Sequence, residues 1–535
     1  MKFVEHPLIK KDSIESRLYQ EMIIGRAVSS DLLCVLPTGL GKTPIAIVLS
    51  VHRLSKFLGS KVLIMAPTKP LVEQHFNSFR GAINLPEENF VLVTGMNKPE
   101  ARMEMYSKAS VIFATPQTIQ NDLRDGRISL ADFSLLVFDE AHHSVGDYAY
   151  PYIAKVYAEQ AKNKRIVGLT ASPGGTKAKI KEIMDNLGIK QVEIRTEKDF
   201  DVEPWVKEKQ VEWVYVNLPE AFLEISTCLK TAYTNRLEKL RKIGFNKPVG
   251  IINKRDLLEL QQRLIASPSR DFKKFWGVSL VSQAIKIEHA LGLLETQGIT
   301  SLWNYFRKLS SDKAKSSKSI LKDKYIGKAM KLAEELEKKG QKHPKIAKLS
   351  EIVSKQLRIK PDSRIILFAN YREMVREIVK SLANVDGARP GEFMGQKEGM
   401  TQNEQKLRID EFREGKYNVL VTTSIGEEGI HVADADLAIF YEPVASEIRS
   451  IQRRGRVGRT NVGRVIILIA KKTRDEAYYW VAQKKERTME RTLHEMKGKE
   501  DILKIKKEEI GSRTEIVRKS REKRVKNQSD LTDFG

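Results

Sequence analysis

Cysteine and long apolar runs are both scarce in this sequence. Cys34 and Cys228 are the only cysteines among its 535 residues. Two are too few for a cysteine-based zinc cluster, so we expect buried apolar thiols in a reducing compartment. No run of about 18 apolar residues occurs, which excludes a membrane-spanning helix. The N-terminal segment MKFVEHPLIKKDSIESR lacks the apolar core and small-residue cleavage site of a secretory signal. We therefore expect a cytoplasmic protein with no membrane partner.

Acidic residues are too few to balance the basic ones. Lys and Arg total 93 and Asp and Glu total 69, which gives a formal net charge of +24 at pH 7. An excess of this size favours binding to polyanions or anionic surfaces, although it indicates little about the fold. At about 150 residues per domain, the length of the chain predicts roughly three to four domains.

Two segments of the chain alternate short apolar runs with amphipathic stretches that are long enough for crossover helices. The runs lack polar alternation, which is typical of strands buried on both faces of a parallel sheet. In the first segment we expect strands at 32–36, 62–66, 90–93, 111–114, 135–138 and 166–169. In the second we expect strands at 365–369, 419–422, 437–441 and 465–470. The predicted fold class is α/β, with two doubly wound parallel-sheet domains.

A different pattern separates the two α/β segments. From about 219 to 340 the chain is rich in Leu, Lys, Glu and Arg at helical spacing, which predicts a mainly helical, basic domain. The polar stretch 310–319 is expected to be an exposed loop within it. Beyond about 472 the chain is helical and charged, and we expect a helix at 477–482 to pack on the second α/β segment. The predicted domains are 1–204 and 345–490 for the α/β units, 205–344 for the helical insertion and 491–535 for a charged tail or linker.

A glycine-rich loop follows the first predicted strand. LPTGLGKT (36–43) lies between an apolar strand and an apolar helix, which is the context that a phosphate-binding loop requires. Its glycines let backbone N–H groups turn toward phosphates, its lysine supplies a positive charge, and the threonine after the lysine can coordinate Mg²⁺. Leu36 stands where the usual pattern has Gly, so the loop alone is a partial match. The candidate ligands are Thr38, Gly39, Gly41, Lys42 and Thr43.

A second candidate element is LLVFDEAHH (135–143), where a buried strand ends in two carboxylates. Ligands of α/β proteins bind at this edge of a parallel sheet. Asp139 would hold Mg²⁺ through water, and Glu140 could act as the general base on an attacking water. By itself the pattern also fits a solvated turn with two acids and a packed pair of histidines. The glycine-rich loop upstream in the same segment favours the catalytic interpretation.

With these two elements the chain resembles a superfamily 2 helicase of the DEAH-box type. The other segments that match this family, in order, are RLYQ (17–20), APTKPLVEQ (66–74), ATPQTI (114–119), LTASP (169–173), ILFANYREM (366–374), VTTSIGEEGI (421–430) and QRRGRVGR (452–459). The resemblance implies two RecA-like domains that close on ATP and Mg²⁺ and step along nucleic acid as they open and close.

The resemblance also implies roles for individual residues. Arg17 and Gln20 would recognise adenine. The residues expected to hold the nucleic-acid backbone are Thr68, Lys69, Thr115, Gln117, Gln396 and Thr422. Those expected to couple hydrolysis to strand contacts are His142, Thr170 and Ser172. In the second domain Gln452, Arg456 and Arg459 would share one face of a helix. An arginine placed on the γ-phosphate would stabilise charge in the transition state, although a basic helix lying along nucleic acid is the other interpretation.

Within the superfamily the chain is most similar to the Hef and Fanconi-anaemia M group of branched-DNA helicases. The likeness rests on GQKEGMTQNEQKLRIDEFREGKYNVLVTTS (395–424), on FYEPVASEIRSIQRRGR (440–456) and on the helical insertion. His431 departs from the group, which usually has an Asp there beside the ribose. Archaeal Hef proteins also carry a nuclease domain with an E-R-K-x-x-x-D signature, which these 535 residues lack. Either the chain is the helicase portion of a longer protein or the nuclease is absent. We expect the first, in an archaeal, nucleoid-associated protein.

Two further features suggest partners. The segments SPSRDFKKFW (267–276) and WNYFRK (303–308) place cations beside aromatic rings. Such rings could stack on a base at a junction, but for any one ring a place in the core is favoured. The C-terminal residues QSDLTDFG resemble a sliding-clamp-binding peptide through Gln528, Leu531 and Phe534. This match is partial, because Gly535 occupies the second aromatic position.

The expected function is that of an ATP-dependent DNA helicase or translocase acting on forked or branched DNA, in replication-fork processing and DNA repair. An RNA-directed helicase or double-stranded-RNA-stimulated ATPase is the first alternative, because backbone contacts are similar on both polymers. A non-catalytic DNA-binding scaffold is the second alternative. The presence of Lys42, Asp139, Glu140, Arg456 and Arg459 counts against it.

Overall fold

The described part of the chain forms two compact units. The computed structural model describes residues 2–206, 210–242, 245, 247–248, 252, 254–266, 272–394, 400–423, 435–443, 464–481, 484 and 487–496. Residues 2–206 belong to the first unit together with 484 and 487–496, and the other described residues belong to the second. None of the helices in these ranges is long and apolar enough to cross a membrane.

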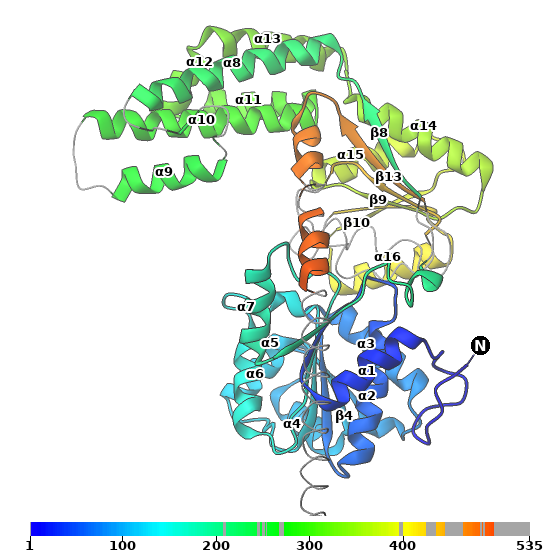
Figure 1. Ribbon diagram of the computed structural model, residues 1–535. Helices are drawn as coiled ribbons and strands as arrows, with labels where there is room; N and C mark the ends of the chain where they lie inside the picture. Colours follow the sequence, from blue (N-terminus) through cyan, green and yellow to red (C-terminus); the bar gives the residue numbers. More distant parts are fainter. Residues whose placement is uncertain are drawn as a thin grey trace, which may run out of the picture. The chain divides into compact units, whose positions relative to one another are not determined.

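The first unit is built on a seven-stranded parallel sheet (Figure 1). The strands are β1 (Leu32–Val35), β2 (Lys61–Met65), β3 (Phe90–Val93), β4 (Val111–Ala114), β5 (Phe133–Asp139), β6 (Ile166–Thr170) and β7 (Gln191–Ile194). They lie in the order β3-β4-β2-β5-β6-β1-β7, and each neighbouring pair is parallel. Every residue of β1, β4, β5 and β6 is buried, as their unbroken apolar runs predict.

Helices cover both faces of this sheet, because alternate residues of each strand point to opposite sides. Leu32 and Cys34 of β1 belong to one apolar core, and Leu33 and Val35 to the other. The helices against the first core are α1 (Leu18–Ser29), α2 (Lys42–Lys56) and α3 (Lys69–Ala82). Those against the second core are α4 (Pro99–Lys108), α5 (Pro116–Arg124), α6 (Ala149–Gln160) and α7 (Lys177–Leu187). The fold is therefore doubly wound, as expected.

The second unit contains a six-stranded parallel sheet. Its strands are β8 (Gln210–Val216), β9 (Ile365–Phe368), β10 (Pro390–Phe393), β11 (Val419–Thr422), β12 (Leu437–Phe440) and β13 (Arg464–Ala470), in the order β10-β11-β9-β12-β13-β8. The helices of this sheet include α14 (Pro344–Ile359), α15 (Arg372–Leu382) and α16 (Gln402–Arg413). A further helix at 474–481 packs on the sheet, as the sequence predicts, since Tyr479 lies edge-on against Trp213 at 4.5 Å between ring centroids.

Strand β8 is a correction to the predicted domain boundaries. The sequence interpretation assigned residues 205–344 to the helical insertion, but β8 pairs with β13 from Gln210 opposite Arg464 to Val216 opposite Ala470. Its polar residues alternate with apolar ones, as suits a strand at the edge of a sheet. Among the described strands its one neighbour, β13, lies about 250 positions later in the chain, so no local pattern could reveal the pairing.

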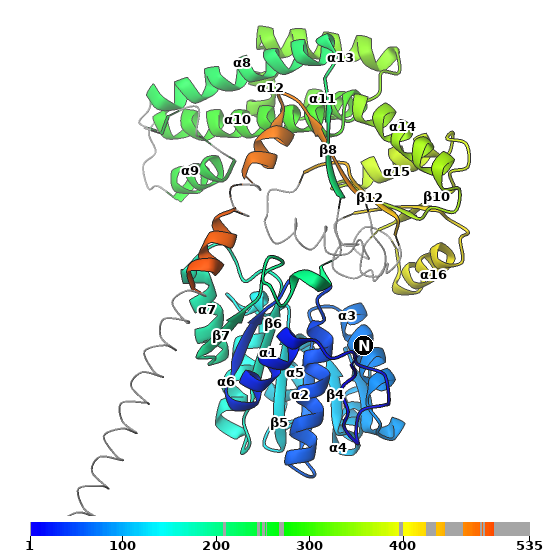
Figure 2. The same cartoon turned by 45° about the vertical axis from the view of Figure 1, so that its right-hand side comes forward.

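A helical bundle follows β8 directly (Figure 2). It consists of α8 (Glu220–Lys242), α9 (Lys254–Ala266), α10 (Phe272–Thr296), α11 (Ile299–Ser311), α12 (Lys315–Leu321) and α13 (Lys324–Lys338). The predicted exposed loop at 310–319 is wrong at both ends, because 310–311 lie in α11 and 315–319 lie in α12. Lys286 Nζ donates to Asp312 Oδ2 at 2.8 Å and to Ser317 Oγ at 2.5 Å. Ser317 is fully buried. Because its hydroxyl is hydrogen-bonded, this polar segment can pack inside the bundle with few apolar side chains.

Candidate nucleotide and nucleic-acid site

The loop between β1 and α2 has the backbone shape that phosphate binding requires. Gly39 and Gly41 both have a left-handed backbone, with φ of 87° and 80°. A Cβ at Gly41 would displace the amide of Gln20, and the positive φ would strain any residue with a side chain. Lys42 is the first residue of α2, and its Nζ donates to the carbonyl of Leu36 at 3.2 Å. The loop therefore curls around an ammonium group at a helix N-terminus, an arrangement that fits a phosphate chain.

Helix α1 braces this loop from one side. Gln20 Nε2 donates to the carbonyls of Leu40 and Gly41 at 3.2 Å each, and the Tyr19 hydroxyl donates to Leu40 O at 2.8 Å. Burial raises the pKa of Tyr19, so its hydroxyl stays a donor. The amide N–H group of Gln20, which the resemblance assigns to adenine, is thus engaged with the loop backbone.

Arg17 rests on an aromatic ring that the sequence interpretation did not single out. Its guanidinium lies over the ring of Trp205, 4.4 Å from the centroid, and its Nη2 pairs with Glu15 Oε2 at 2.9 Å. Cation–ring stacking of this kind fixes the plane of the guanidinium. Trp205 lies about 190 positions after Arg17 in the chain. Only the tertiary structure brings the two side chains together.

The carboxylate that ends β5 is held by buried partners. His75 Nε2 lies 2.8 Å from Asp139 Oδ2, and both side chains are almost fully buried. The Tyr150 hydroxyl donates to the backbone carbonyl of Asp139 at 2.7 Å, and burial raises the pKa of Tyr150 well above its usual range. Glu140 has a left-handed backbone with φ of 49°. Such strain in a residue with a side chain costs about 1–3 kcal/mol and is concentrated at functional sites.

Three strand ends meet at one edge of the first sheet. β6 lies between β1 and β5, and the Leu36 N–H donates to Thr170 O at 3.0 Å. His142 Nδ1 is 3.2 Å from Thr170 Oγ1 and 3.3 Å from Glu140 Oε2. His142 therefore bridges the acidic element and the 169–173 segment, and Thr170 bridges that segment and the phosphate-binding loop.

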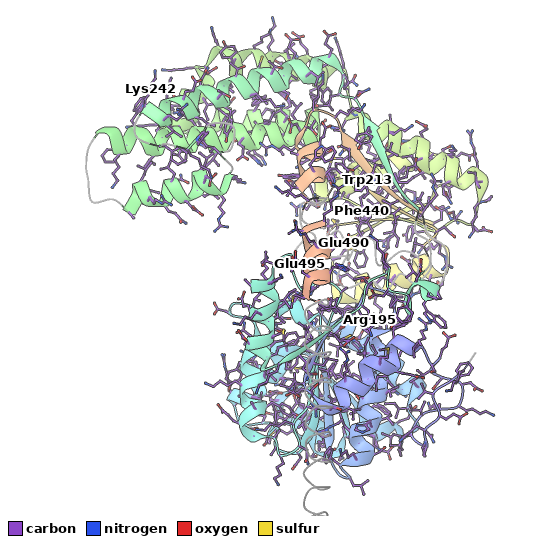
Figure 3. The ribbon with its side chains drawn as sticks, viewed as in Figure 1. Arg195, Trp213, Lys242, Phe440, Glu490 and Glu495 are labelled. Atoms are coloured by element: carbon purple, nitrogen blue, oxygen red, sulfur yellow. The ribbon has the colours of Figure 1, made fainter. Side chains whose placement is uncertain are left out.

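The helix at 487–496 covers Ser172 within the first unit. The Ser172 hydroxyl donates to Met489 Sδ at 3.2 Å, and Met489 joins the apolar core of that unit. Lys177 Nζ and Glu495 Oε2 lie 2.5 Å apart, and Glu495 can be found on this helix in Figure 3. The prediction had divided these residues between the second domain and the tail. It was wrong because charged residues dominate the segment and hide its short apolar stripe.

Four of the residues expected to hold a nucleic-acid backbone lie at two adjacent helix N-termini. Thr68 and Lys69 stand at the start of α3, and Thr115 and Gln117 at the start of α5. These helices follow β2 and β4, which are neighbours in the sheet. Thr115 Oγ1 is 2.8 Å from Thr118 Oγ1. Helix N-termini and short polar side chains are suited to phosphate oxygens.

Thr422 differs from those four residues. It ends β11 in the second unit, is fully buried, and donates its hydroxyl to Thr423 O at 3.1 Å. A hydroxyl in this position is not exposed to a phosphate, so the structure does not favour the direct contact that the resemblance implies for Thr422. The other predicted residues of interest lie outside the described residues: Gln396, His431, Gln452, Arg456, Arg459, Gln528, Leu531 and Phe534.

The two aromatic segments of the bundle have different surroundings. Phe275 and Trp276 of α10 are 63% and 37% exposed. Phe306 is buried, and Trp303 and Tyr305 pack partly buried against the same apolar cluster. The rings at 303–308 are therefore core, whereas those at 275 and 276 are on the surface.

Family models match three consecutive parts of the chain. The DEAD/DEAH box helicase model matches residues 17–180, and the helicase conserved C-terminal domain model matches 344–461. Between them, the helical-bundle model of an ATP-dependent RNA helicase family matches 221–340, the residues of α8–α13. The matched regions thus contain β1–β6 of the first sheet, the bundle, and β9–β12 of the second sheet.

Individual relatives agree with these models. The crystal structure of the Pyrococcus furiosus Hef helicase domain has a TM-score of 0.71 and 48% identity, and it covers 88% of this chain and 99% of that one. A Methanocaldococcus jannaschii protein named as an ATP-dependent RNA helicase is 43% identical over 92% of this chain and 63% of its own length. ATP-dependent DNA helicase Mph1 of Neurospora crassa is 31% identical over 90% of this chain and 43% of its own length.

These matches confirm the predicted fold class of two parallel-sheet α/β domains with a helical bundle between them. The chain spans less than two thirds of the length of the two curated relatives. The chain therefore belongs to the DEAD/DEAH box helicases of superfamily 2, as an ATP-dependent helicase similar to the helicase portion of archaeal Hef.

Proposed function

We propose that this protein hydrolyses ATP to translocate on forked or branched DNA and to remodel it during DNA repair and replication-fork processing. The observation that carries the proposal is the meeting of the glycine-rich loop, the Asp139–Glu140 pair and the 169–173 segment at one sheet edge. The names of the Hef and Mph1 relatives support DNA as the polymer.

The nucleotide would lie on the loop at 36–43. Backbone N–H groups at the start of α2 and the Lys42 ammonium would hold the phosphates, with Thr38, Gly39 and Gly41 shaping the loop. Thr43 and Asp139 offer a hydroxyl and a carboxylate, the hard oxygen donors that Mg²⁺ prefers, and the ion would neutralise charge on the phosphates. Arg17, which is stacked on Trp205, would recognise the base together with the amide oxygen of Gln20.

Glu140 would accept the proton of the attacking water. His142 touches Glu140 and Thr170, so a change at the carboxylate can reach Ser172 and the 169–173 segment. Gln452, Arg456 and Arg459 would act from the second domain, with an arginine stabilising charge on the γ-phosphate. Hydrolysis would then require closure of two separately folded domains.

The nucleic-acid track would use backbone contacts. Thr68, Lys69, Thr115 and Gln117 present hydroxyl, ammonium and amide groups at two helix N-termini. Gln396 would add a contact from the second domain, whereas the buried Thr422 would support the track only indirectly. Contacts to phosphate fix position without reading sequence, so little base specificity is expected. The exposed Phe275 and Trp276 of the bundle would stack on bases at a junction.

The test is ATP hydrolysis by the whole chain with forked DNA, four-way junctions, linear duplex DNA and duplex RNA. We expect the strongest stimulation by forks and junctions. Lys42→Ala should abolish ATPase activity because the phosphates lose their cation, while fork binding stays largely unchanged. Full ATPase activity in this variant would show that Lys42 does not hold the phosphates.

An RNA-directed helicase is the second candidate, favoured by the name of the Methanocaldococcus jannaschii relative. Stimulation by duplex RNA that exceeds stimulation by every DNA would support it and overturn the DNA proposal. Equal activity without any nucleic acid would contradict both.

The C-terminal peptide is proposed to bind a sliding clamp through Gln528, Leu531 and Phe534. Leu531 and Phe534 have the spacing of one short helical turn, which would place both in an apolar pocket. Deleting residues 528–535 should abolish clamp capture without changing ATPase activity. Unchanged capture by the shortened chain would end this proposal.

A further inference from the structure

The buried hydrogen bond between His75 and Asp139 joins two elements far apart in sequence. His75 lies on α3 and Asp139 is the last residue of β5. Their exposed fractions are 3% and 7%, and His75 Nε2 is 2.8 Å from Asp139 Oδ2. A polar pair this well buried forms a strong, directional contact, because water does not compete for either group.

The surroundings of the ring fix the direction of the bond. His75 Nδ1 is buried and has no hydrogen-bond partner among the described residues. A proton on Nδ1 would therefore be a buried N–H with nothing to accept it, and Nε2 would present a lone pair to a carboxylate. We assign the proton to Nε2, which donates to Asp139 and leaves only a lone pair at Nδ1.

The backbone of Asp139 is held as well. The Tyr150 hydroxyl donates to its carbonyl at 2.7 Å and to Met65 O at 3.3 Å. With the backbone fixed by Tyr150 and Oδ2 fixed by His75, the carboxylate has little rotational freedom. Asp139 is thus pre-oriented by His75 and Tyr150, which lie outside the phosphate-binding loop.

We propose that His75 is a positioning residue of the Mg²⁺ site: it holds Asp139 by Oδ2, so that Oδ1 remains for the ion or for a water on the ion. The inference rests on the proposed function, in which Asp139 holds Mg²⁺. Hydrogen-bond partners of metal-binding carboxylates fix ligand orientation, and their loss usually costs 10–100-fold in metal affinity or activity.

The test compares three variants of the full chain. His75→Leu removes the donor and keeps an apolar side chain, whereas His75→Gln restores an N–H at similar reach. Phe79→Leu is the matched control, because Phe79 lies on the same helix, is fully buried and contacts the ring of His75 without reaching Asp139. Thermal unfolding of each variant reports whether it folds, and His75→Asn, whose amide is too short to reach, replaces His75→Leu if that variant does not.

Two readouts separate positioning from packing. The first is the Mg²⁺ concentration at half-maximal ATPase activity, expected to rise about 10–100-fold in His75→Leu and to return toward wild type in His75→Gln. The second is binding of a fluorescent ATP analogue with Mg²⁺ and with EDTA. His75→Leu should lose the Mg²⁺-dependent part of the affinity and keep the affinity measured in EDTA.

Unchanged Mg²⁺ dependence in a folded His75→Leu protein would overturn the inference. An equal loss in EDTA and in Mg²⁺, or an equal effect of Phe79→Leu, would show a packing role and would overturn it too. A wild-type chain without ATPase activity would refute the proposed function, but the binding readout would still decide the role of His75.

Discussion

The two sheets of this protein share one strand order and carry different residues at corresponding strand ends. Counted along the chain within each unit, both sheets read third, fourth, second, fifth, sixth, first, and the first sheet adds β7 beside β1. After β1 comes the glycine-rich loop with Lys42, whereas after the corresponding β8 comes the helical bundle. One topology thus offers two equivalent edges, and the segment after each strand decides what that edge can do.

The acidic positions extend the comparison. Asp139 ends β5 and Glu140 follows it, and Glu442 comes shortly after the corresponding β12. Glu442 is buried and accepts the backbone N–H of Asn370 at 3.0 Å, whereas Glu140 lies beside His142. A carboxylate in the same topological place is therefore part of a backbone network in one sheet and of the candidate catalytic edge in the other.

The largest expected effect on ATP turnover comes from replacing Glu140 with glutamine, and Glu442→Gln is the matched change in the second sheet. Glu140→Gln should bind ATP but lower turnover about 10²–10⁴-fold, because a general base is lost. Glu442→Gln should lower turnover less than tenfold. Single-turnover ATP hydrolysis measures both variants. Equal losses of turnover would show that the two sheet edges do not differ in function.

Both units contain a buried ion pair: Arg195 with Glu193 in the first unit, and Lys345 with Asp475 in the second. Lys345 and Asp475 are both almost fully buried, and Lys345 Nζ also donates to Tyr441 O at 2.7 Å. Lys345→Met should lower the free energy of unfolding by about 3–5 kcal/mol, because Asp475 is left unpaired. Denaturant unfolding measures this loss, and the double variant Lys345→Met with Asp475→Leu should recover most of it. A double variant that is as unstable as Lys345→Met alone would contradict the charge argument.

A smaller effect is expected on the surface of the bundle. Phe275→Ala or Trp276→Ala should weaken fork binding by about 1–3 kcal/mol if each ring stacks on a base. Phe200 of the first unit is 81% exposed, and Phe200→Ala is the matched control, with no expected change. Fluorescence anisotropy with a labelled fork measures all three. Equal losses for Phe200→Ala and Phe275→Ala would show that the loss of binding is not specific to the bundle.

Local patterns were informative where local chemistry defines a feature. The loop at 36–43 was predictable because glycines must supply positive φ and a lysine must lie at a helix N-terminus. Buried strands such as β5 were predictable because both their faces are apolar. The position of Asp139 at a sheet edge then followed from the strand that precedes it.

Features made by distant residues were not predictable in this way. β8 was missed because its neighbour is β13, and α12 because Lys286 satisfies Ser317 across the bundle. The stacking of Arg17 on Trp205 and the bond from His75 to Asp139 join residues that no spacing rule connects. The order of strands in a sheet places these groups together, and a linear chain does not display that order.

The amino-acid chain thus specified two α/β lobes, a basic helical insertion and the residue types of an ATP-hydrolysing helicase, because periodicity and turn chemistry act over a few residues. Its three-dimensional packing specified which carboxylate is pre-oriented, which arginine is stacked and which aromatic rings reach the surface. Those outcomes depend on burial and on partners far away in the chain, and burial is a property of the folded whole.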